Sequence, residues 1–235
     1  DEDLSTSAVT RLGDVLGNAE EYQEADEWIG SVVNQLDLTR TYSCREFLHL
    51  MGRELAEIAH EDGVLTSSYK ARIPVFCPDI SGSELAIGLA RVKFEKKIHV
   101  GFDLGQDTLD MMQINAKSRN SAMIACGSTS SNGMVNLTEL SSYISRGNVR
   151  GHKYAISIST DSVPLDQRTP SYGGNHTSAF GKLHKGATTA FVPCDPSIAL
   201  PMIITALSQT AAKFMKGRKR PNFAFSGQTM TIDVP

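Results

Sequence analysis

The 235-residue sequence lacks the spacings that mark most metal and redox sites. Its four cysteines, at positions 44, 77, 126 and 194, form no CxxC pair. This argues against a zinc module and a disulfide framework, and it favours a reducing compartment. The six histidines supply no set with metal-ligand spacing. We therefore expect no bound metal.

The sequence also lacks a large excess of positive or negative charge. The net charge is −3, from 23 lysines and arginines against 26 acidic residues, so we expect no nucleic-acid partner. The one basic cluster, within residues 216–220, is short and predicts a solvated tail. No apolar run approaches the roughly 18 residues of a membrane span, and the start shows no signal-peptide pattern. These absences predict a cytoplasmic globular protein without a membrane partner.

Apolar residues recur with alternating helical and strand-like periods along the chain. Ser43 and Glu46 form a capping box that predicts the start of one helix. His49 and His60 lie off the apolar face of that helix, and we expect both to be exposed. Strands alternating with helices predict the α/β class, with a Rossmann-like parallel sheet and helices on both faces. The predicted helices are 19–36, from 43, 107–114, 135–144 and 196–215; the predicted strands are 73–78, 98–102, 122–126, 154–158 and 187–192.

Polar or small residues follow four of the predicted strands. Asp103 and Asp107 follow the strand 98–102, and the turn 127–131 follows the strand 122–126. Thr160-Asp161 and Asp195 follow the next two strands. In open α/β sheets ligands bind at the carboxyl ends of strands, so the pattern indicates a nucleotide crevice. A helix cap is the alternative role for each acid, and the turn at Gly127 is neither GxGxxG nor a P-loop.

The stretch Phe180-Gly181-Lys182-Leu183 closes a loop rich in Gly, Ser and Thr. A lysine at such a loop-to-strand boundary can reach into a crevice, where apolar surroundings would depress its pKa and make it an amine nucleophile. On local sequence alone, a solvated surface lysine is the commoner outcome.

Several segments together resemble deoxyhypusine synthase, over roughly residues 1–215. The closest match is Arg72-Ile73-Pro74-Val75-Phe76-Cys77-Pro78 with Ser81-Gly82-Ser83, which resembles the family segment IPVF(C/S)P…DGS. Gly181-Lys182 resembles the end of the family motif SWGK, and Asp103 with Asp107 resembles its paired aspartates. Further matches are residues 11–16, 22–28, 45–47, 52–55, 154–156 and Thr160.

The resemblance implies an activity and a site. NAD takes a hydride from spermidine, an active-site lysine carries the aminobutyl group as an imine, and the group passes to a lysine of translation initiation factor 5A. The family is tetrameric, with active sites shared between subunits. By this resemblance Lys182 is the catalytic residue. The cofactor-binding residues are Glu2, Asp103, Gly127, Ser128, Thr160, Asp161, Asp166 and Asp195, and the substrate-binding residues are Asp107, Asn136, His176 and Phe180.

The sequence departs from the family pattern around the polyamine site. Gly133 or Asn132 stands where a histidine is expected, residues 167–174 replace an acidic and serine-rich segment, His176 replaces a glutamate and Phe180 a tryptophan. A neutral or basic group in place of an acid loses attraction for a polycation. We therefore hypothesise a regulatory pseudoenzyme paralogue in a heterotetramer. The alternatives are a divergent active synthase using Lys182, a homospermidine synthase-like aminobutyl transferase, and a nucleotide-binding fold without a polyamine role.

The resemblance also predicts a domain layout. Residues 1–215 form an NAD-binding domain and residues 216–235 an extended C-terminal tail. The start at Asp1-Glu2-Asp3-Leu4 aligns with a point well inside the family fold, so we expect the N-terminal part of that fold to be absent from the chain as given.

Overall fold

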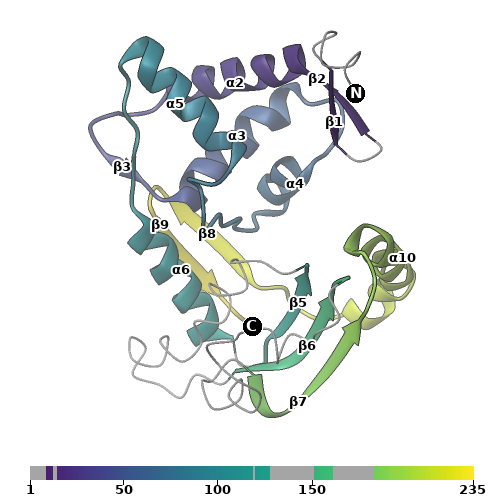
Figure 1. Cartoon of the computed structure of the whole chain (residues 1–235). Coiled ribbons are helices and arrows are strands. Elements are labelled where there is room, and N and C mark those ends of the chain that lie inside the picture. The colour runs from purple at the N-terminus through teal and green to yellow at the C-terminus, as the bar shows by residue number, and fades with distance from the viewer. Residues whose placement is uncertain (1–8, 13–14, 119, 128–150, 161–182) are drawn as a thin grey trace. The chain divides into compact units, whose positions relative to one another are not determined.

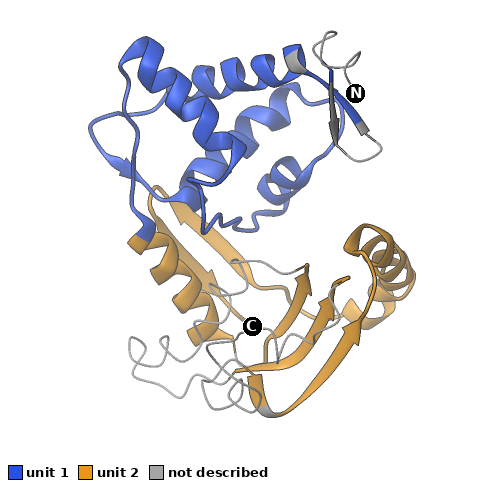
Figure 2. Ribbon diagram, viewed as in Figure 1, with its two compact units in different colours: residues 1–104 blue, residues 105–235 orange. Residues whose placement is uncertain are grey.

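The computed structural model describes residues 9–12, 15–118, 120–127, 151–160 and 183–235. The chain divides into two compact units, Asp1–Leu104 and Gly105–Pro235 (Figure 2). The division into residues 1–215 and 216–235 that the sequence predicts stays a prediction.

Unit 1 is mostly helical, with two small pairs of strands. Its first two strands pair antiparallel, whereas β3 and β4 pair parallel, with Thr41 opposite Gly101 and Tyr42 opposite Phe102. The elements in chain order (Figure 1) are β1 Val9–Leu12, β2 Val15–Asn18, α2 Ala19–Val33, β3 Thr41–Tyr42, α3 Cys44–Ile58, α4 Val64–Ala71, α5 Glu84–Lys96 and β4 Gly101–Phe102.

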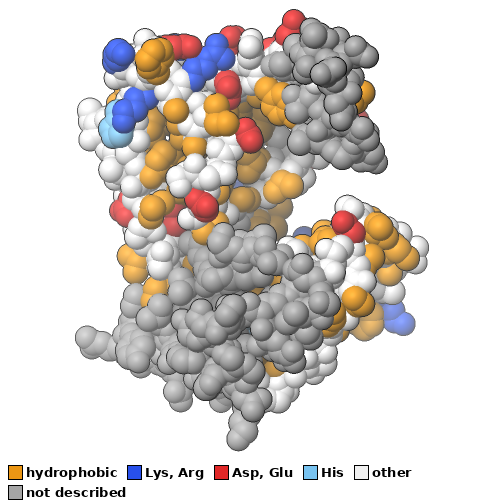
Figure 3. All heavy atoms as spheres, viewed as in Figure 1, with side chains coloured by type: hydrophobic (Ala, Val, Ile, Leu, Met, Phe, Trp, Pro, Cys, Tyr) orange, Lys and Arg blue, Asp and Glu red, His pale blue; other side chains and the backbone are white. Residues whose placement is uncertain are grey.

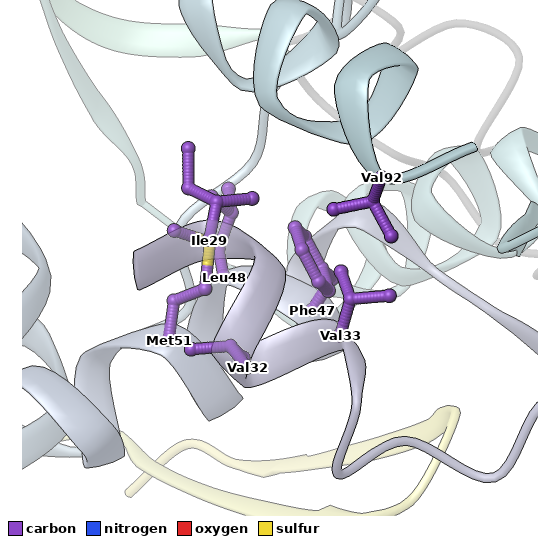
Figure 4. Close-up of a cluster of buried hydrophobic side chains, with 7 residues drawn as sticks. All are labelled: Ile29, Val32, Val33, Phe47, Leu48, Met51 and Val92. Atoms are coloured by element: carbon purple, nitrogen blue, oxygen red, sulfur yellow. The ribbon is translucent and has the colours of Figure 1, made fainter. Parts of the chain in front are cut away.

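The core of unit 1 lies between α2, α3 and α5. Apolar residues recur three and four positions apart on α2 and α3, so each helix presents one apolar face. An added Cβ at Gly88 would lie 2.8 Å from the side chain of Ile29, so α5 approaches α2 closely at this glycine. The buried cluster (Figure 4) consists of Ile29, Val32 and Val33 of α2, Phe47, Leu48 and Met51 of α3, and Val92 of α5.

The strand predicted at residues 73–78 is not formed. Pro74 and Pro78 have no backbone N–H to give to a ladder, and the segment runs as coil instead. Val75 and Cys77 still pack partly buried against the core cluster, which explains the apolar pattern. The predicted strand 98–102 is shortened to β4, and the helices α4 and α5 were not predicted.

Unit 2 contains a parallel three-stranded sheet in the order β5-β6-β7. Its central strand aligns Ile156 with Ile124 of β5 and with Ala190 of β7. Helices with parallel strands confirm the predicted α/β class. The predicted helix 135–144 lies outside the described residues. The elements are α6 Leu104–Lys117, β5 Ala122–Cys126, β6 His152–Ile158, β7 Leu183–Val192, α10 Pro196–Met215, β8 Asn222–Ser226 and β9 Thr229–Asp233.

Helix α10 has the predicted bounds, with Pro196 in its first turn and Pro201 inside. Of the helices in the described part of the chain, it is the one that could cross a membrane by length and composition. One such helix is weak evidence for a span. After it, β8 and β9 form an antiparallel hairpin. Lys117 Nζ, at the end of α6, donates a hydrogen bond to the carbonyl of Ile232 in β9 at 2.7 Å.

Candidate functional site

Three predicted cofactor residues lie at the carboxyl edge of the three-stranded sheet. Gly127 follows β5, Thr160 comes two residues after β6, and Asp195 comes three residues after β7. Because the strands are parallel and in register, their carboxyl ends share one edge. The structure thus brings Gly127, Thr160 and Asp195 to the edge that the sequence indicated.

The turn at Gly127 leaves its backbone open on one side. The Gly127 N–H donates to the carbonyl of Ile158 at 2.8 Å, which extends the ladder by one residue. The residue has φ +73°, a conformation that favours glycine. An added Cβ would meet no atom within 4 Å among the described surroundings. Among the described residues, none blocks this side of the backbone.

Asp195 caps helix α10. Its Oδ1 accepts from the Ser197 N–H at 2.8 Å and from the Ser197 hydroxyl at 2.7 Å. The hydroxyl hydrogen bond is the main cause of a lowered pKa for Asp195, followed by the backbone N–H. The helix-cap role is therefore confirmed, and the carboxylate is an ionised acceptor at a helix N-terminus. Capping uses Oδ1 and does not exclude a ligand hydroxyl as a further donor to the group.

The other two described candidates flank the start of α6. Asp103 directly follows β4 in unit 1, is half-buried, and donates its N–H to the carbonyl of Tyr42 at 2.8 Å. Asp107 lies in the first turn of α6 and is 4% exposed. Asp110 is fully buried, accepts from Gln106 Nε2 at 2.8 Å, and was missed by sequence reasoning. Its spacing from Asp107, three residues on a helix, was the signal that could have found it.

A cluster of charged and aromatic side chains supports the strand beside Asp103. The Tyr42 hydroxyl accepts from the Asp37 N–H at 2.8 Å. The Arg40 guanidinium lies 3.8 Å from the centre of the Tyr42 ring and makes two hydrogen bonds to the carboxylate of Glu46, at 2.7 and 3.0 Å. This bidentate pair raises the pKa of Arg40, mainly through the hydrogen bonds with Glu46. The cluster holds β3, and with it the carbonyl that receives the Asp103 N–H.

The remaining predicted site residues lie outside the described part of the chain. Within the described part, no group of three or more His, Cys, Asp and Glu side chains could hold a metal ion. The residues outside it are Glu2, Ser128, Asn136, Asp161, Asp166, His176, Phe180 and Lys182.

The described site offers carboxylates and open backbone. Carboxylates accept hydrogen bonds from hydroxyl groups such as those of a ribose, and glycine turns admit phosphates. The donor set therefore fits a dinucleotide better than a metal ion. A sequence profile described as deoxyhypusine synthase matches residues 1–207. The chain belongs to the deoxyhypusine synthase family.

Two relatives and one solved structure illustrate the similarity. The protein named "Probable deoxyhypusine synthase 2" of Methanosarcina mazei is 30% identical, over 97% of this chain and 65% of the relative. The protein of that name from Archaeoglobus fulgidus is 27% identical, over 87% of this chain and 66% of its own length. A crystal structure of an Entamoeba histolytica protein assigned as a deoxyhypusine synthase shares the fold, with a TM-score of 0.53 at 15% identity, covering 79% of this chain and 55% of that one.

The chain is shorter than these members of the deoxyhypusine synthase family. It spans about 65% of the Methanosarcina mazei relative and 66% of the Archaeoglobus fulgidus relative. The activity, substrates and partners of a whole deoxyhypusine synthase are therefore proposals for this chain.

Proposed function

We propose that the chain is a subunit of a cytoplasmic deoxyhypusine synthase, which uses NAD to transfer the aminobutyl group of spermidine to a lysine of translation initiation factor 5A. Family membership supports the reaction class. The observation that carries the assignment to a nucleotide is the arrangement of Gly127, Thr160 and Asp195 at one sheet edge. These three residues of unit 2 are the ones we assign to NAD, and Asp103 of unit 1 is assigned to it by the family resemblance alone.

Each assigned residue has a specific part. Gly127 leaves room for phosphates beside the backbone, and the ionised carboxylate of Asp195 accepts from a hydroxyl. The resemblance also assigns Asp103 of unit 1 to the cofactor, and its backbone N–H donates to the carbonyl of Tyr42. NAD, when bound, supplies the hydride acceptor and later returns the hydride. The buried carboxylate of Asp107 is assigned to the polyamine, because acids attract a polycation.

We propose further that this subunit is a regulatory paralogue that activates a catalytic subunit within a heterotetramer. The support is the set of replacements at positions expected to bind spermidine. Gly133, His176, Phe180 and residues 167–174 all depart from the family pattern. The loss of close charge pairs weakens spermidine binding by about 1–3 kcal/mol for each pair. A partner subunit with the full pattern would supply the working site.

A second candidate is a divergent active synthase. Gly181-Lys182 is retained although the residues around it are changed. A desolvated lysine forms imines and is the group that the reaction needs. In that case the chain alone would transfer the aminobutyl group.

The two candidates are separated by a reconstitution experiment. The chain is purified alone and with a catalytic paralogue, and each preparation receives NAD, spermidine and factor 5A. Deoxyhypusine on factor 5A is measured by mass spectrometry. The regulatory role predicts at least about tenfold more product from the mixture than from either subunit alone, since a tenfold rate change needs only about 1.4 kcal/mol. Full activity of the chain alone would favour the divergent active synthase. An aminobutylated small amine formed without factor 5A would favour a homospermidine synthase-like transferase.

A further inference from the structure

Helix α10 exposes most of its apolar surface. Among its residues Ala199 alone is buried, whereas Leu207 is 54% and Phe214 is 65% exposed. Figure 3 shows hydrophobic side chains at the surface of this helix. An exposed apolar patch of this kind marks an interaction surface. The exposed large apolar residues of α10 are Ile198, Met202, Ile204, Leu207, Phe214 and Met215.

The second half of α10 has an apolar side and a polar side. Four apolar residues share one side, at intervals of three, four and three residues, and three polar residues at intervals of four lie on the other. A helix of this kind, with lysine on its polar side, can lie in the boundary between water and lipid. The apolar residues, which we call the α10 stripe, are Ile204, Leu207, Ala211 and Phe214, and the polar ones are Thr205, Gln209 and Lys213.

The sequence in and after α10 is cationic. From residue 196 to residue 232 it has no aspartate or glutamate and five lysines and arginines, whereas the whole chain has a net charge of −3. All five cations fall within residues 213–220, which we call the basic segment, and all are exposed. The basic segment begins in the last turn of α10, so the positive charge directly adjoins the α10 stripe.

The hydroxyl groups of α10 are bonded within the helix. Thr205 Oγ1 donates to the carbonyl of Pro201 at 2.7 Å, and Ser208 Oγ donates to that of Thr205 at 2.8 Å. A hydroxyl that is satisfied inside its own helix adds little cost when its surroundings become less polar. These side chains therefore do not oppose contact of the helix with an apolar phase.

The connections of α10 favour a helix that lies on a membrane over one that crosses it. The strand before the helix, β7, belongs to the three-stranded sheet. The hairpin after it is bonded to α6 through Lys117 and Ile232. Both flanking segments belong to unit 2, so a crossing helix would place parts of one compact unit on opposite sides of a bilayer.

We propose that α10 binds the surface of a membrane containing anionic phospholipid, with the α10 stripe at the acyl chains and the basic segment among the headgroups. An anionic bilayer offers an apolar phase and negative charge side by side, in the order in which the stripe and the basic segment follow each other. A nucleic acid would pair with the basic segment but would leave the α10 stripe in water.

Membrane binding is measured by co-sedimentation of the full chain with vesicles. Vesicles of equimolar phosphatidylcholine and phosphatidylglycerol should bind the chain at least about tenfold more tightly than vesicles of phosphatidylcholine alone. Salt at about 1 M should remove this preference, because the Debye length falls to about 3 Å. Wild-type chain that stays in the supernatant with the mixed vesicles would overturn the proposal.

A matched pair of phenylalanine variants tests the α10 stripe. Phe214→Ser should weaken binding to the mixed vesicles at least about tenfold, because the largest side chain of the stripe no longer reaches the acyl chains. Phe94→Ser on α5, where the side chain is 78% exposed, should leave binding within about twofold of wild type. Circular dichroism checks the folding of each variant, and Leu207→Ala, a milder change in the stripe, replaces Phe214→Ser if that variant unfolds.

A matched pair of double variants tests the basic segment. Lys219→Gln with Arg220→Gln should weaken binding to the mixed vesicles at least about tenfold and leave binding to phosphatidylcholine unchanged. Lys93→Gln with Lys96→Gln, which removes the same charge from exposed positions of α5, should stay within about twofold of wild type. Binding that depends on the basic segment but survives Phe214→Ser would show electrostatic adsorption alone and would refute the role of the stripe.

A protein contact is the competing role for the α10 stripe. The molar mass of wild type and Phe214→Ser is measured by light scattering without vesicles. An assembly that Phe214→Ser dissociates, together with no sedimentation of wild type on mixed vesicles, would assign the stripe to another protein chain and refute the proposal. These measurements need no NAD, spermidine or activity, so their failure leaves the proposed function untouched.

Discussion

Replacing Arg40 by alanine should destabilise the chain through the buried carboxylate of Glu46. The substitution removes two charge-assisted hydrogen bonds and the contact of the guanidinium with the Tyr42 ring. The Glu46 side chain is 7% exposed, so it keeps little access to water when its partner is lost, but the Arg40 side chain is 39% exposed and the pair is partly screened. We expect a loss of about 2 kcal/mol, between the cost of a lost surface pair and that of a broken buried pair.

The assay is urea unfolding followed by circular dichroism, arranged as a double-mutant cycle. Arg40→Ala, Glu46→Gln and the double variant are compared, and the coupling free energy should be about 1–2 kcal/mol. Arg40→Lys should recover part of the loss, because lysine keeps the charge but not the bidentate geometry. Arg91→Ala on α5, whose partners are exposed, should leave the unfolding midpoint unchanged. A coupling near zero would refute the account of this cluster.

Three further predictions concern single residues. Burial lowers the pKa of His49, so the folded state favours the neutral ring. The free energy of unfolding should therefore fall as the pH decreases below about 6.5. His49→Gln should remove this pH dependence. Asp195→Asn keeps an oxygen that accepts from the Ser197 N–H, so it should keep the thermal stability while weakening NAD binding in calorimetry. Asp195→Ala should lower both the stability and the NAD affinity. Equal NAD affinity in the wild type and both variants would show that Asp195 acts only as a helix cap. Gly52→Ala should cost about 1–2 kcal/mol in urea unfolding despite better helix propensity, because its Cβ would lie 2.7 Å from the Leu65 carbonyl oxygen; a stabilised variant would contradict this.

Local sequence rules predicted the elements that satisfy their own hydrogen bonds. The start of α3 after Ser43 is confirmed, since the Ser43 hydroxyl accepts from the Glu46 N–H at 3.1 Å. The Glu46 carboxylate is bound by Arg40. The bounds of α10 follow from its cap and from Pro196. The strand at residues 73–78 failed because apolar content alone cannot provide a pairing partner, and two prolines remove donors.

The candidate site was predictable only where it depends on the order of strands and helices along the chain. Gly127, Thr160 and Asp195 lie at one edge of the sheet because parallel strands end there, and this follows from the alternation of strands and helices. Asp110 and Glu46 are buried, and no local pattern predicts the burial of an acidic side chain. His49 was expected to be exposed, but it is half-buried with its ring 5.1 Å from that of Tyr69 on another helix.

In the proposed heterotetramer, another subunit's lysine carries the aminobutyl group while this chain activates that subunit. The most direct measurement follows transfer of labelled spermidine to factor 5A in a mixture of this chain with a catalytic paralogue. Lys182→Ala in this chain should leave the rate of the mixture within about twofold of wild type, as should the exposed control Lys96→Ala, while replacing the paralogue's active-site lysine should abolish transfer. Loss of transfer on Lys182→Ala alone would contradict the account.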